Sequence, residues 1–436
     1  MNPVSLTPSA AATLLKAAEA EHTGQLVSAE LLYLQVLREC PSHAGSMERL
    51  ARLAMQRGDP GRAIEFLRAV LAADPARVPA AIDLAVALVN TDRSEAAASV
   101  LEATLAAVPG AATAWLLLGQ IRESLDDDFG ALKAWYQAVT RAQRAGEWLD
   151  AATTPPSLVD VVAHAIERVH VGRRALLFGA FEGLRQEYGA SELKRVDRAL
   201  TGYLREWNAA PRDPRQRPKF FYFPGLPDDP YHDPFLQPWA ERLQAAFPEV
   251  RAEALRVIDE DRRLPAFIEV PEGVRPGHLA GAASEPSWEA LFFYRRGRRF
   301  DANHERCPRT SAILESIELC RIAEQAPEIL FSVLRPGTHI LPHHGVSNVR
   351  LVMHLPLIVP RDCALNLVGV GEHHWQEGRL VMFDDTFSHE AWNRSDQTRV
   401  VLLMDCWNPH LSAVEKKAVA SLVEAISGLQ DTGLAE

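Results

Sequence analysis

Residues 331–358 and 379–405 decide the fold, and they read FSVLRPGTHILPHHGVSNVRLVMHLPLI and RLVMFDDTFSHEAWNRSDQTRVVLLMD. In both stretches, short runs of β-branched and apolar residues are separated by clusters of Pro, Gly, Asn and Asp. This pattern is typical of a small antiparallel barrel or sandwich. The strands expected here cover residues 329–334, 349–358, 364–368, 379–383 and 398–405.

Two histidines lie near the expected strand ends. His343 is expected just before a strand and His389 just beyond the next-to-last strand. Imidazoles on neighbouring strand ends can bind one metal, and together with oxygen ligands they suit ferrous iron. The usual acidic third ligand would stand two residues after the first histidine, where this chain has Gly345. Spacing alone therefore leaves open both a metal site and histidines that only cap strands or bond within a loop.

Longer motifs around these histidines resemble the aspartyl/asparaginyl β-hydroxylase family. They are residues 342–351 (PHHGVSNVRL), residues 383–390 (FDDTFSHE) and Arg399, with residues 220–239 and 288–299 upstream. The resemblance implies a dioxygenase on a double-stranded β-helix that depends on Fe(II) and uses 2-oxoglutarate and O2 as cosubstrates. The aspartyl hydroxylase branch itself lacks the acidic ligand, so the glycine after the first histidine matches the family.

The resemblance also assigns roles to individual residues. His343 and His389 correspond to the metal ligands and are thus the expected catalytic residues. Arg399 corresponds to the arginine that binds the distal carboxylate of 2-oxoglutarate, and Ser332 to the hydroxyl that assists it. A guanidinium suits bidentate carboxylate binding, whereas a lone strand arginine without these motifs would indicate a surface ion pair.

Residues 349–355 alternate in a way that predicts which side chains face the metal cavity. Arg350, Val352 and His354 share the cavity face, whereas the four residues Val349, Leu351, Met353 and Leu355 share the core face. Arg350 and His354 are expected to contact the cofactor, with His354 at the metal-chelating carboxylate of 2-oxoglutarate or, alternatively, serving as a structural histidine. His344 is expected to point away from the metal.

One position departs from the animal aspartyl hydroxylases, which carry arginine where this chain has Val352. Losing that charge should weaken recognition of an aspartyl carboxylate by about 1.5–3 kcal/mol. The resemblance therefore leaves the substrate open. Asp384, Asp385 and Glu390 are candidates to hold a water at the missing ligand position, although Asp-Asp before Thr-Phe also fits a simple turn.

The first third of the chain repeats with a period of 34 residues. Each period has a small residue in one helix, a bulky residue four positions later and then a proline, which resembles the tetratricopeptide repeat. About four repeats are expected over residues 10–145. The small positions are Ala29, Ala63, Ala97 and Ala131; the bulky ones are Tyr33, Leu67, Leu101 and Trp135; the prolines are Pro41, Pro75 and Pro109. Such solenoids usually bind a peptide or a partner protein, and a spacer or dimerisation arm is the alternative.

The sequence thus predicts a multidomain α plus β protein. Residues 10–145 form the repeat solenoid, residues 146–215 a helical bridge and linker, residues 216–415 the hydroxylase-like double-stranded β-helix, and residues 416–436 a C-terminal helix and tail. Apolar spacing between residues 158 and 207 predicts two helices in the bridge. Residues 209–218 (AAPRDPRQRP) are expected to be a polar, proline-rich linker.

Composition narrows the possible partners and compartment. The 436-residue chain is 47% hydrophobic and 24% charged, with a net charge of −11, which argues against nucleic acid or an anionic membrane as the main partner. No signal peptide and no apolar run of the roughly 18 residues needed for a membrane span is evident, which favours a cytoplasmic protein. The five scattered cysteines are expected to be free, buried thiols.

The predicted function is hydroxylation, dependent on Fe(II) and 2-oxoglutarate, of an aspartyl, asparaginyl or related residue in a protein or peptide recruited by the solenoid. One alternative is a hydroxylase of a free or carrier-bound amino acid. A second, non-enzymatic alternative is a repeat scaffold with a degenerate barrel, which the joint presence of His343, His389, Arg399 and Ser332 disfavours.

Overall fold

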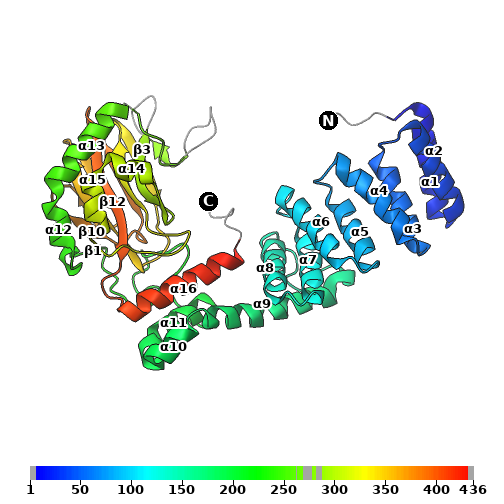
Figure 1. The fold of residues 1–436 in the computed structure, drawn as a ribbon, viewed down its shortest axis with the longest axis horizontal. Coiled ribbons are helices and arrows are strands. Elements are labelled where there is room, and N and C mark those ends of the chain that lie inside the picture. Colours follow the sequence, from blue (N-terminus) through cyan, green and yellow to red (C-terminus); the bar gives the residue numbers. More distant parts are fainter. Residues whose placement is uncertain (1–5, 262, 269–276, 281–286, 431–436) are drawn as a thin grey trace. The chain divides into compact units, whose positions relative to one another are not determined.

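The computed structural model describes residues 6–261, 263–268, 277–280 and 287–430 (Figure 1). Its internal contacts separate two compact units, Met1–Ala175 with Gly428–Glu436, and Leu176–Ser427. The boundaries fall within two helices, α9 (Val159–Gly179) and α16 (Ala413–Leu429). Each unit has its own hydrophobic core, as expected for independent domains.

The first unit is built from antiparallel helix pairs. Every alanine of the predicted small positions is fully buried, and the bulky residues four positions later are at most 2% exposed. The prolines follow the ends of α2, α4 and α6. The 34-residue period is therefore confirmed as a packing period. The helices are α1 (Pro8–His22), α2 (Leu26–Glu39), α3 (Ala44–Gln56), α4 (Pro60–Ala73), α5 (Val78–Val89), α6 (Ser94–Ala107), α7 (Ala112–Ser124) and α8 (Asp128–Arg144).

The last helix pair depends on one glycine. Gly119 of α7 lies against Trp135 of α8, and a Cβ atom at this glycine would be 2.3 Å from the indole ring. Glycine inside a helix lowers stability by about 1 kcal/mol relative to alanine. At this position the loss is offset because the large Trp135 side chain can be buried against the glycine.

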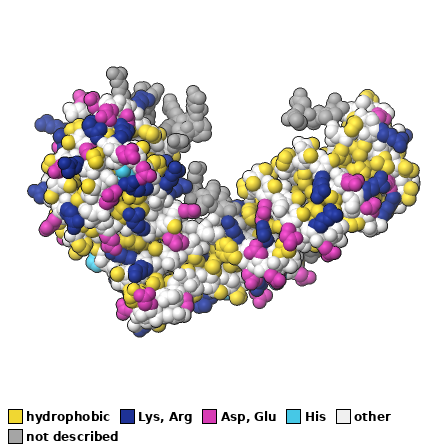
Figure 2. All heavy atoms as spheres, viewed as in Figure 1, with side chains coloured by type: hydrophobic (Ala, Val, Ile, Leu, Met, Phe, Trp, Pro, Cys, Tyr) yellow, Lys and Arg dark blue, Asp and Glu magenta, His cyan; other side chains and the backbone are white. Residues whose placement is uncertain are grey.

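Charged side chains of the solenoid pair between neighbouring repeats. Arg77 binds Glu48 at 2.5 Å, and Arg52 binds Asp83 at 3.0 Å. On the face seen in Figure 2, acidic and basic side chains of this unit are interspersed with hydrophobic ones. Partly exposed pairs of this kind contribute roughly 0–1 kcal/mol each, so the apolar packing between helices is the main source of stability.

Helices of the second unit form a layer outside its β-sheets. After α9 the chain forms α10 (Glu182–Tyr188) and α11 (Lys194–Tyr203), so the bridge contains three helices where the sequence predicted two. Leu193 and Leu200 share a core with Leu422 and Ile426 of α16. The C-terminal helix begins three residues earlier than expected and packs into this layer.

Two antiparallel sheets form the remainder of the second unit. The seven-stranded sheet has the order β1-β10-β7-β12-β5-β3-β4, and the five-stranded sheet has the order β2-β6-β11-β8-β9. The first sheet comprises β1 (Tyr231–His232), β10 (Val381–Phe383), β7 (Arg350–Ile358), β12 (Arg399–Trp407), β5 (Ile329–Leu334), β3 (Trp288–Arg295) and β4 (Arg298–Arg299). The second comprises β2 (Leu279–Ala280), β6 (Thr338–His343), β11 (His389–Asn393), β8 (Cys363–Leu367) and β9 (Gly371–His373). This arrangement confirms the predicted double-stranded β-helix.

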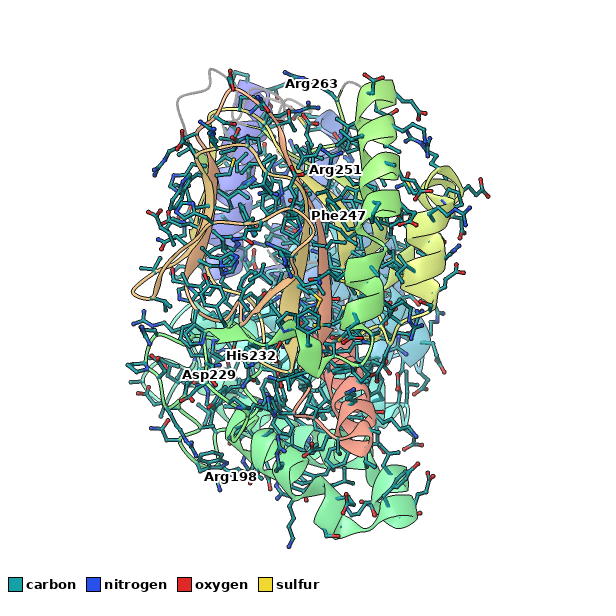
Figure 3. The ribbon with its side chains drawn as sticks, turned by 90° about the vertical axis from the view of Figure 1, so that its left-hand side faces the viewer. Arg198, Asp229, His232, Phe247, Arg251 and Arg263 are labelled. Atoms are coloured by element: carbon teal, nitrogen blue, oxygen red, sulfur yellow. The ribbon has the colours of Figure 1, made fainter. Side chains whose placement is uncertain are left out.

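One face of the seven-stranded sheet is covered by helices. The helices on this side are α12 (Ala240–Ala245) and α13 (Phe247–Asp261), which are consecutive in the chain, and α14 (Asp301–Arg306) and α15 (Pro308–Glu315), which follow β4. Val250 and Leu314 pack there against Leu351 and Met353, and Figure 3 shows α13, with Phe247 and Arg251, running along the sheet. The residues predicted for the core face of 349–355 are all buried, so the opposite face is left for the cavity.

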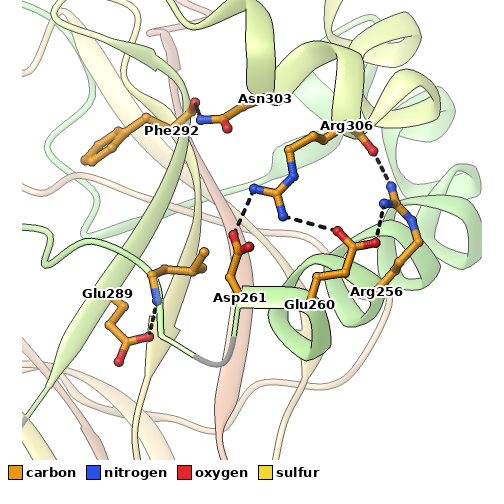
Figure 4. Close-up of polar contacts among 8 residues, drawn as sticks. Arg256, Glu260, Asp261, Glu289, Phe292, Asn303 and Arg306 are labelled. Atoms are coloured by element: carbon orange, nitrogen blue, oxygen red, sulfur yellow. Dashed lines mark hydrogen bonds and ion pairs between the residues drawn. The ribbon is translucent and has the colours of Figure 1, made fainter.

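Polar contacts hold these outer helices together (Figure 4). Glu260 pairs with Arg256 and Arg306, and Arg306 also binds Asp261 at 2.8 Å. The Asn303 amide donates to the carbonyl of Phe292 on β3. These contacts tie α13 and α14 to the sheet on the side away from the cavity.

The structure shows that both histidines lie on strands that the sequence did not predict. The five predicted strands are present within a few residues, but β6 and β11 were not predicted. His343 is the last residue of β6 rather than a residue before a strand, and His389 is the first residue of β11. Both strands carry polar residues at buried positions, such as Thr338, His389 and Asn393, so the sequence shows no regular alternation of apolar and polar residues there.

Two expectations from composition can be compared with the structure. All five cysteines are free and buried, as predicted. Among the described residues, no helix combines the length and the apolar character needed to cross a bilayer.

Candidate active site

Two histidine rings meet where β6 and β11 pair. His343 and His389 are directly opposite in the antiparallel register, and their ring centroids are 4.1 Å apart. The Nδ1 of His343 lies 2.8 Å from the carbonyl oxygen of Leu341, and that of His389 lies 3.0 Å from the carbonyl oxygen of Phe387. Each carbonyl favours the tautomer with the proton on Nδ1, which leaves both Nε2 atoms as lone-pair donors for a metal.

Burial keeps both imidazoles in the form that binds metal. It lowers the pKa of His343 and lowers the pKa of His389 to about 3, and in His389 the neighbouring His343 adds to the shift. In the part of the chain that the structure describes, no set of three or more His, Cys, Asp or Glu side chains is placed to share a metal. His343 and His389 are thus the two side chains whose free Nε2 atoms could hold a metal here.

The space of the missing acidic ligand is taken by another carboxyl group. A Cβ atom on Gly345 would lie 2.0 Å from Cγ of Asp385. The two segments are linked by a 2.6 Å hydrogen bond from the Gly345 amide to the Asp385 carbonyl. The glycine is thus needed for close approach of two stretches, residues 343–346 and 384–389, here called the first and second histidine segments. It lets the Asp385 carboxyl group of the second segment lie beside the first.

Of the three acidic candidates near the histidines, only Asp385 has a carboxyl oxygen without a hydrogen-bond partner among the described residues. Asp384 accepts hydrogen bonds from Thr386 and Gln216, and the carboxylate of Glu390 is bound by His339 and Asn366. The buried Oδ1 of Asp385 has no hydrogen-bond partner among the described residues. Burial raises the pKa of Asp385 to about 7, and Arg350 opposes this shift.

Arg399 is a buried cation with no counter-ion among the described residues. It is 2% exposed, and its Nη1 donates to the hydroxyl and carbonyl oxygens of Ser332 at 3.2 Å. Within the described part of the chain, its Nε has no hydrogen-bond partner. Trp288 also donates to the Ser332 hydroxyl, and the guanidinium lies 5.0 Å from the Trp375 ring centroid. Burial lowers the pKa of Arg399 to about 10. Since uncompensated buried charges are costly, this geometry indicates an anionic ligand.

His354 lines the same cavity as Arg399 and the histidine pair. It is 5% exposed, and neither ring nitrogen has a hydrogen-bond partner in the described chain. Burial lowers its pKa well below the usual value, and Arg399 and His389 add to the effect. A neutral, unpartnered imidazole in this position can donate a hydrogen bond to a carboxylate bound between the metal and the arginine.

Arg350 differs from Arg399 because it already has a carboxylate partner. Its Nη1 lies 2.6 Å from Oδ2 of Asp405, and the other oxygen of this aspartate accepts the Glu328 amide. Of the two guanidinium groups in the cavity, that of Arg350 is therefore paired with a carboxylate, whereas that of Arg399 has no such partner among the described residues. Arg350 remains a proposed cofactor contact, but its charge is largely balanced within the protein.

All predicted cofactor and metal residues line one cavity of about 240 Å3. Its polar lining is Ser332, His343, Arg350, His354, Asp385, His389 and Arg399, together with Glu328, Glu390 and Asp405. Its apolar lining is Phe267, Trp288, Ile340, Val352, Leu365, Phe383, Ala391 and Leu403. Val352 lies on the cavity face as predicted, so the wall is apolar where the animal aspartyl hydroxylases carry a cation.

Sequence reasoning did not find several residues of this site. Trp288 donates to the Ser332 hydroxyl, Trp375 lies against the Arg399 guanidinium, and Asp405 neutralises Arg350. Asp405 could have been predicted from the sequence, because it lies an even number of residues after Arg399 in the last strand and so shares its cavity face. The tryptophans come from segments whose distance from the arginine only the tertiary structure sets.

The fold defines a protein class in which a helical-repeat unit precedes an antiparallel double-stranded β-helix. Residues 244–409 match the model of the aspartyl/asparaginyl beta-hydroxylase family, and residues 8–78 and 54–121 match tetratricopeptide repeat models. The chain is therefore similar to the aspartyl/asparaginyl β-hydroxylase family over residues 244–409 and to tetratricopeptide repeats over residues 8–121.

Curated relatives share the hydroxylase domain. The ornithine lipid ester-linked acyl 2-hydroxylase of Rhizobium tropici is 33% identical over 186 residues, which is 42% of this chain and 62% of that protein. Human aspartate beta-hydroxylase domain-containing protein 2 is 31% identical over 57% of this chain and 65% of its own length. Human aspartyl/asparaginyl beta-hydroxylase is 28% identical over 43% of this chain and 24% of its own length. The chain thus spans less than two thirds of each of these relatives.

Among solved structures, a crystal structure of MamA aligns with 46% of this chain and 98% of its own. The TM-score is 0.31 and the sequence identity 19%.

Proposed function

We propose that this protein is an Fe(II)- and 2-oxoglutarate-dependent hydroxylase. The observation that carries the proposal is the joint presence in one cavity of two neutral histidines and a buried arginine that has no counter-ion in the described part of the chain. When bound, the iron and 2-oxoglutarate would supply the oxidant that converts a C–H bond to C–OH with O2, releasing succinate and CO2. A degenerate scaffold would have no reason to retain an uncompensated buried charge.

The residues then take distinct roles. His343 and His389 would hold the metal through Nε2, while the carbonyls behind them fix their tautomers. Arg399 and Ser332 would bind the distal carboxylate of 2-oxoglutarate, and His354 would donate to its metal-proximal end. Asp385 would accept a hydrogen bond from a water that takes the place of the missing acidic ligand.

Anaerobic titration of the purified protein with Fe(II) and 2-oxoglutarate tests this proposal. We expect stoichiometric iron binding and a weak visible charge-transfer band, both lost in His343→Ala and in His389→Ala. His344→Ala is the matched control, because it removes the neighbouring imidazole, which does not line the cavity, and it should leave the band unchanged. Absence of stoichiometric iron in the wild type would favour the scaffold.

For the substrate, we propose a polypeptide residue of the asparaginyl or aspartyl type, brought to the cavity by the repeat unit. Such repeats usually bind peptides or proteins. Within this class the cavity favours the neutral side chain, because Val352 supplies no charge and Arg350 is paired with Asp405. Among the described residues that line the cavity, an aspartyl carboxylate would therefore find no free cation besides Arg399, which we assign to 2-oxoglutarate.

A second candidate substrate is an acyl chain. The apolar cavity wall around Val352 favours it, and the matched relative from Rhizobium tropici is named as an acyl 2-hydroxylase. A free or carrier-bound amino acid remains the third possibility, with the solenoid binding the carrier.

Mass spectrometry of the products separates these substrates. We expect the wild type to add one oxygen to an asparaginyl peptide or to an acyl ester in preference to the matching aspartyl peptide. Val352→Arg should improve turnover of the aspartyl peptide by about 10- to 150-fold, corresponding to a charged hydrogen bond of about 1.5–3 kcal/mol. Equal turnover of both peptides by the wild type, unchanged by Val352→Arg, would contradict the assignment of this position to substrate choice.

A further inference from the structure

The segment before the matched hydroxylase region lies against both histidine segments. Residues 216–223, here called the bracing segment, precede the family match at 244–409 and include the end of the predicted linker. The Lys219 amide donates to the Gly345 carbonyl at 3.1 Å, and the Phe220 amide donates to the Val346 carbonyl at 2.9 Å. The bracing segment thus fixes the backbone two and three residues after His343.

The same segment also fixes the backbone before His389. Gln216 forms an antiparallel bridge with Phe387, and the Arg217 amide donates to the Thr386 carbonyl at 2.8 Å. Phe387 is the residue whose carbonyl oxygen lies 3.0 Å from Nδ1 of His389. The bridge from Gln216 therefore fixes the residue whose carbonyl group orients the His389 imidazole.

The Gln216 side chain completes the connection. It is 2% exposed, and its Nε2 donates to Oδ2 of Asp384 at 2.7 Å. The other oxygen of Asp384 accepts the Thr386 amide at 2.9 Å and also the Thr386 hydroxyl. Asp384 and Thr386 are fully buried, so without Gln216 one carboxylate oxygen would be left unpaired in the interior, a costly state.

We infer that the bracing segment, through Gln216, positions the two histidine segments and so sets the metal affinity of this protein. Gln216 touches neither histidine ring among the contacts observed; it acts through Asp384, Thr386 and Phe387 as a positioning residue. Groups that orient metal ligands at one remove typically change metal affinity by about 10- to 100-fold. A hydroxylase domain cut at the family boundary would lack this support.

A second buried glutamine of the same unit provides a matched control. Gln237 is 4% exposed and its Nε2 donates to the Trp407 carbonyl at 2.6 Å, away from both histidine segments. Gln216→Met and Gln237→Met each remove one buried amide at nearly constant volume. A general loss of stability would affect both variants, whereas a positioning role affects only the first.

The test uses the full chain and two readouts. In the first, Co(II) is titrated and its visible spectrum gives the affinity at a temperature where circular dichroism shows all proteins folded. We expect Gln216→Met to weaken Co(II) binding by about 10- to 100-fold and Gln237→Met to leave it within about twofold of the wild type. Equal weakening in both variants, or none in Gln216→Met, would overturn the inference.

The second readout needs no metal and therefore does not rest on the proposed function. Amide hydrogen exchange of the metal-free protein should become at least about tenfold faster over residues 384–389 in Gln216→Met, and remain unchanged there in Gln237→Met. If the wild type binds no metal, the proposed function fails while this readout still decides the inference. If Gln216→Met does not fold, Thr386→Val removes the hydroxyl donor from the other side of Asp384 and takes its place in both readouts.

Discussion

Arg399→Met is expected to raise the 2-oxoglutarate concentration needed for half-saturation by about 10- to 150-fold. The physical reason is the loss of a charged hydrogen bond to the distal carboxylate, about 1.5–3 kcal/mol. Iron binding should be unaffected, because the side chain contacts Ser332 and Trp375 rather than the histidines. The measurement is a 2-oxoglutarate titration of the charge-transfer band, with succinate release as a second assay.

The same variant separates a ligand-binding arginine from a structural one. Removing an uncompensated buried cation should leave the melting temperature of the cofactor-free protein unchanged or raise it, because the desolvation cost disappears. The stabilisation that 2-oxoglutarate gives to the wild type should be lost. A marked fall in the melting temperature without cofactor would show that Arg399 serves the fold instead.

Arg335→Met is the matched control for this experiment. Arg335 binds Glu289 through two contacts of 2.9 and 2.6 Å, and the glutamate is buried. Removing the arginine leaves a buried carboxylate without this partner, so the melting temperature should fall. The response to 2-oxoglutarate should remain, because neither residue lines the cavity.

Gly345→Ala is expected to weaken metal binding by about 10- to 100-fold, the range found when second-layer support of a metal site is lost. The added methyl group would overlap the carboxyl group of Asp385, whose Cγ lies 2.0 Å from the Cβ position. The side chain must move, and with it the acceptor that we propose for the metal-bound water. Equilibrium titration with Co(II) or Fe(II) under anaerobic conditions measures the change.

Two further variants test why Gly345→Ala should bind metal more weakly. Gly345→Ala combined with Asp385→Ala relieves the overlap, so it should restore stability but bind metal as weakly as Asp385→Ala alone. Gly183→Ala is the control for a glycine substitution as such: it lies in α10, and its Cβ atom meets no atom within 4 Å. Full metal affinity in Asp385→Ala would rule out the proposed role of this carboxyl group.

Local patterns in the sequence were sufficient for most elements of this fold. The period of 34 placed Ala29 and its counterparts in the helix interfaces, because a small residue is needed wherever two helices approach closely. The alternation from Val349 to Leu355 separated the core face from the cavity face of β7, because successive strand residues point to opposite sides. In both patterns, small or apolar residues recur at the positions that are buried, so the repeat and the strand can be recognised from the sequence alone.

The histidine strands were harder to recognise because they are short and carry polar residues on both faces, so apolar and polar residues do not alternate along them. β6 and β11 carry polar side chains toward a cavity, and His343 and His389 were found through motifs shared with a family rather than through strand periodicity. Their direct pairing in the sheet, with ring centroids 4.1 Å apart, depends on the register between two strands separated by 45 residues.

By itself, the sequence determined the repeat unit, the double-stranded β-helix and the residues that resemble a hydroxylase site. Only the tertiary structure decided that Asp385 occupies the space beside Gly345, that Arg350 is neutralised by Asp405, and that residues 216–223 brace both histidine segments rather than forming a free linker. Periodicity reports which face of an element is buried. It carries no information on which distant backbone amide or carboxyl group fills a given space, because that depends on how the whole chain packs.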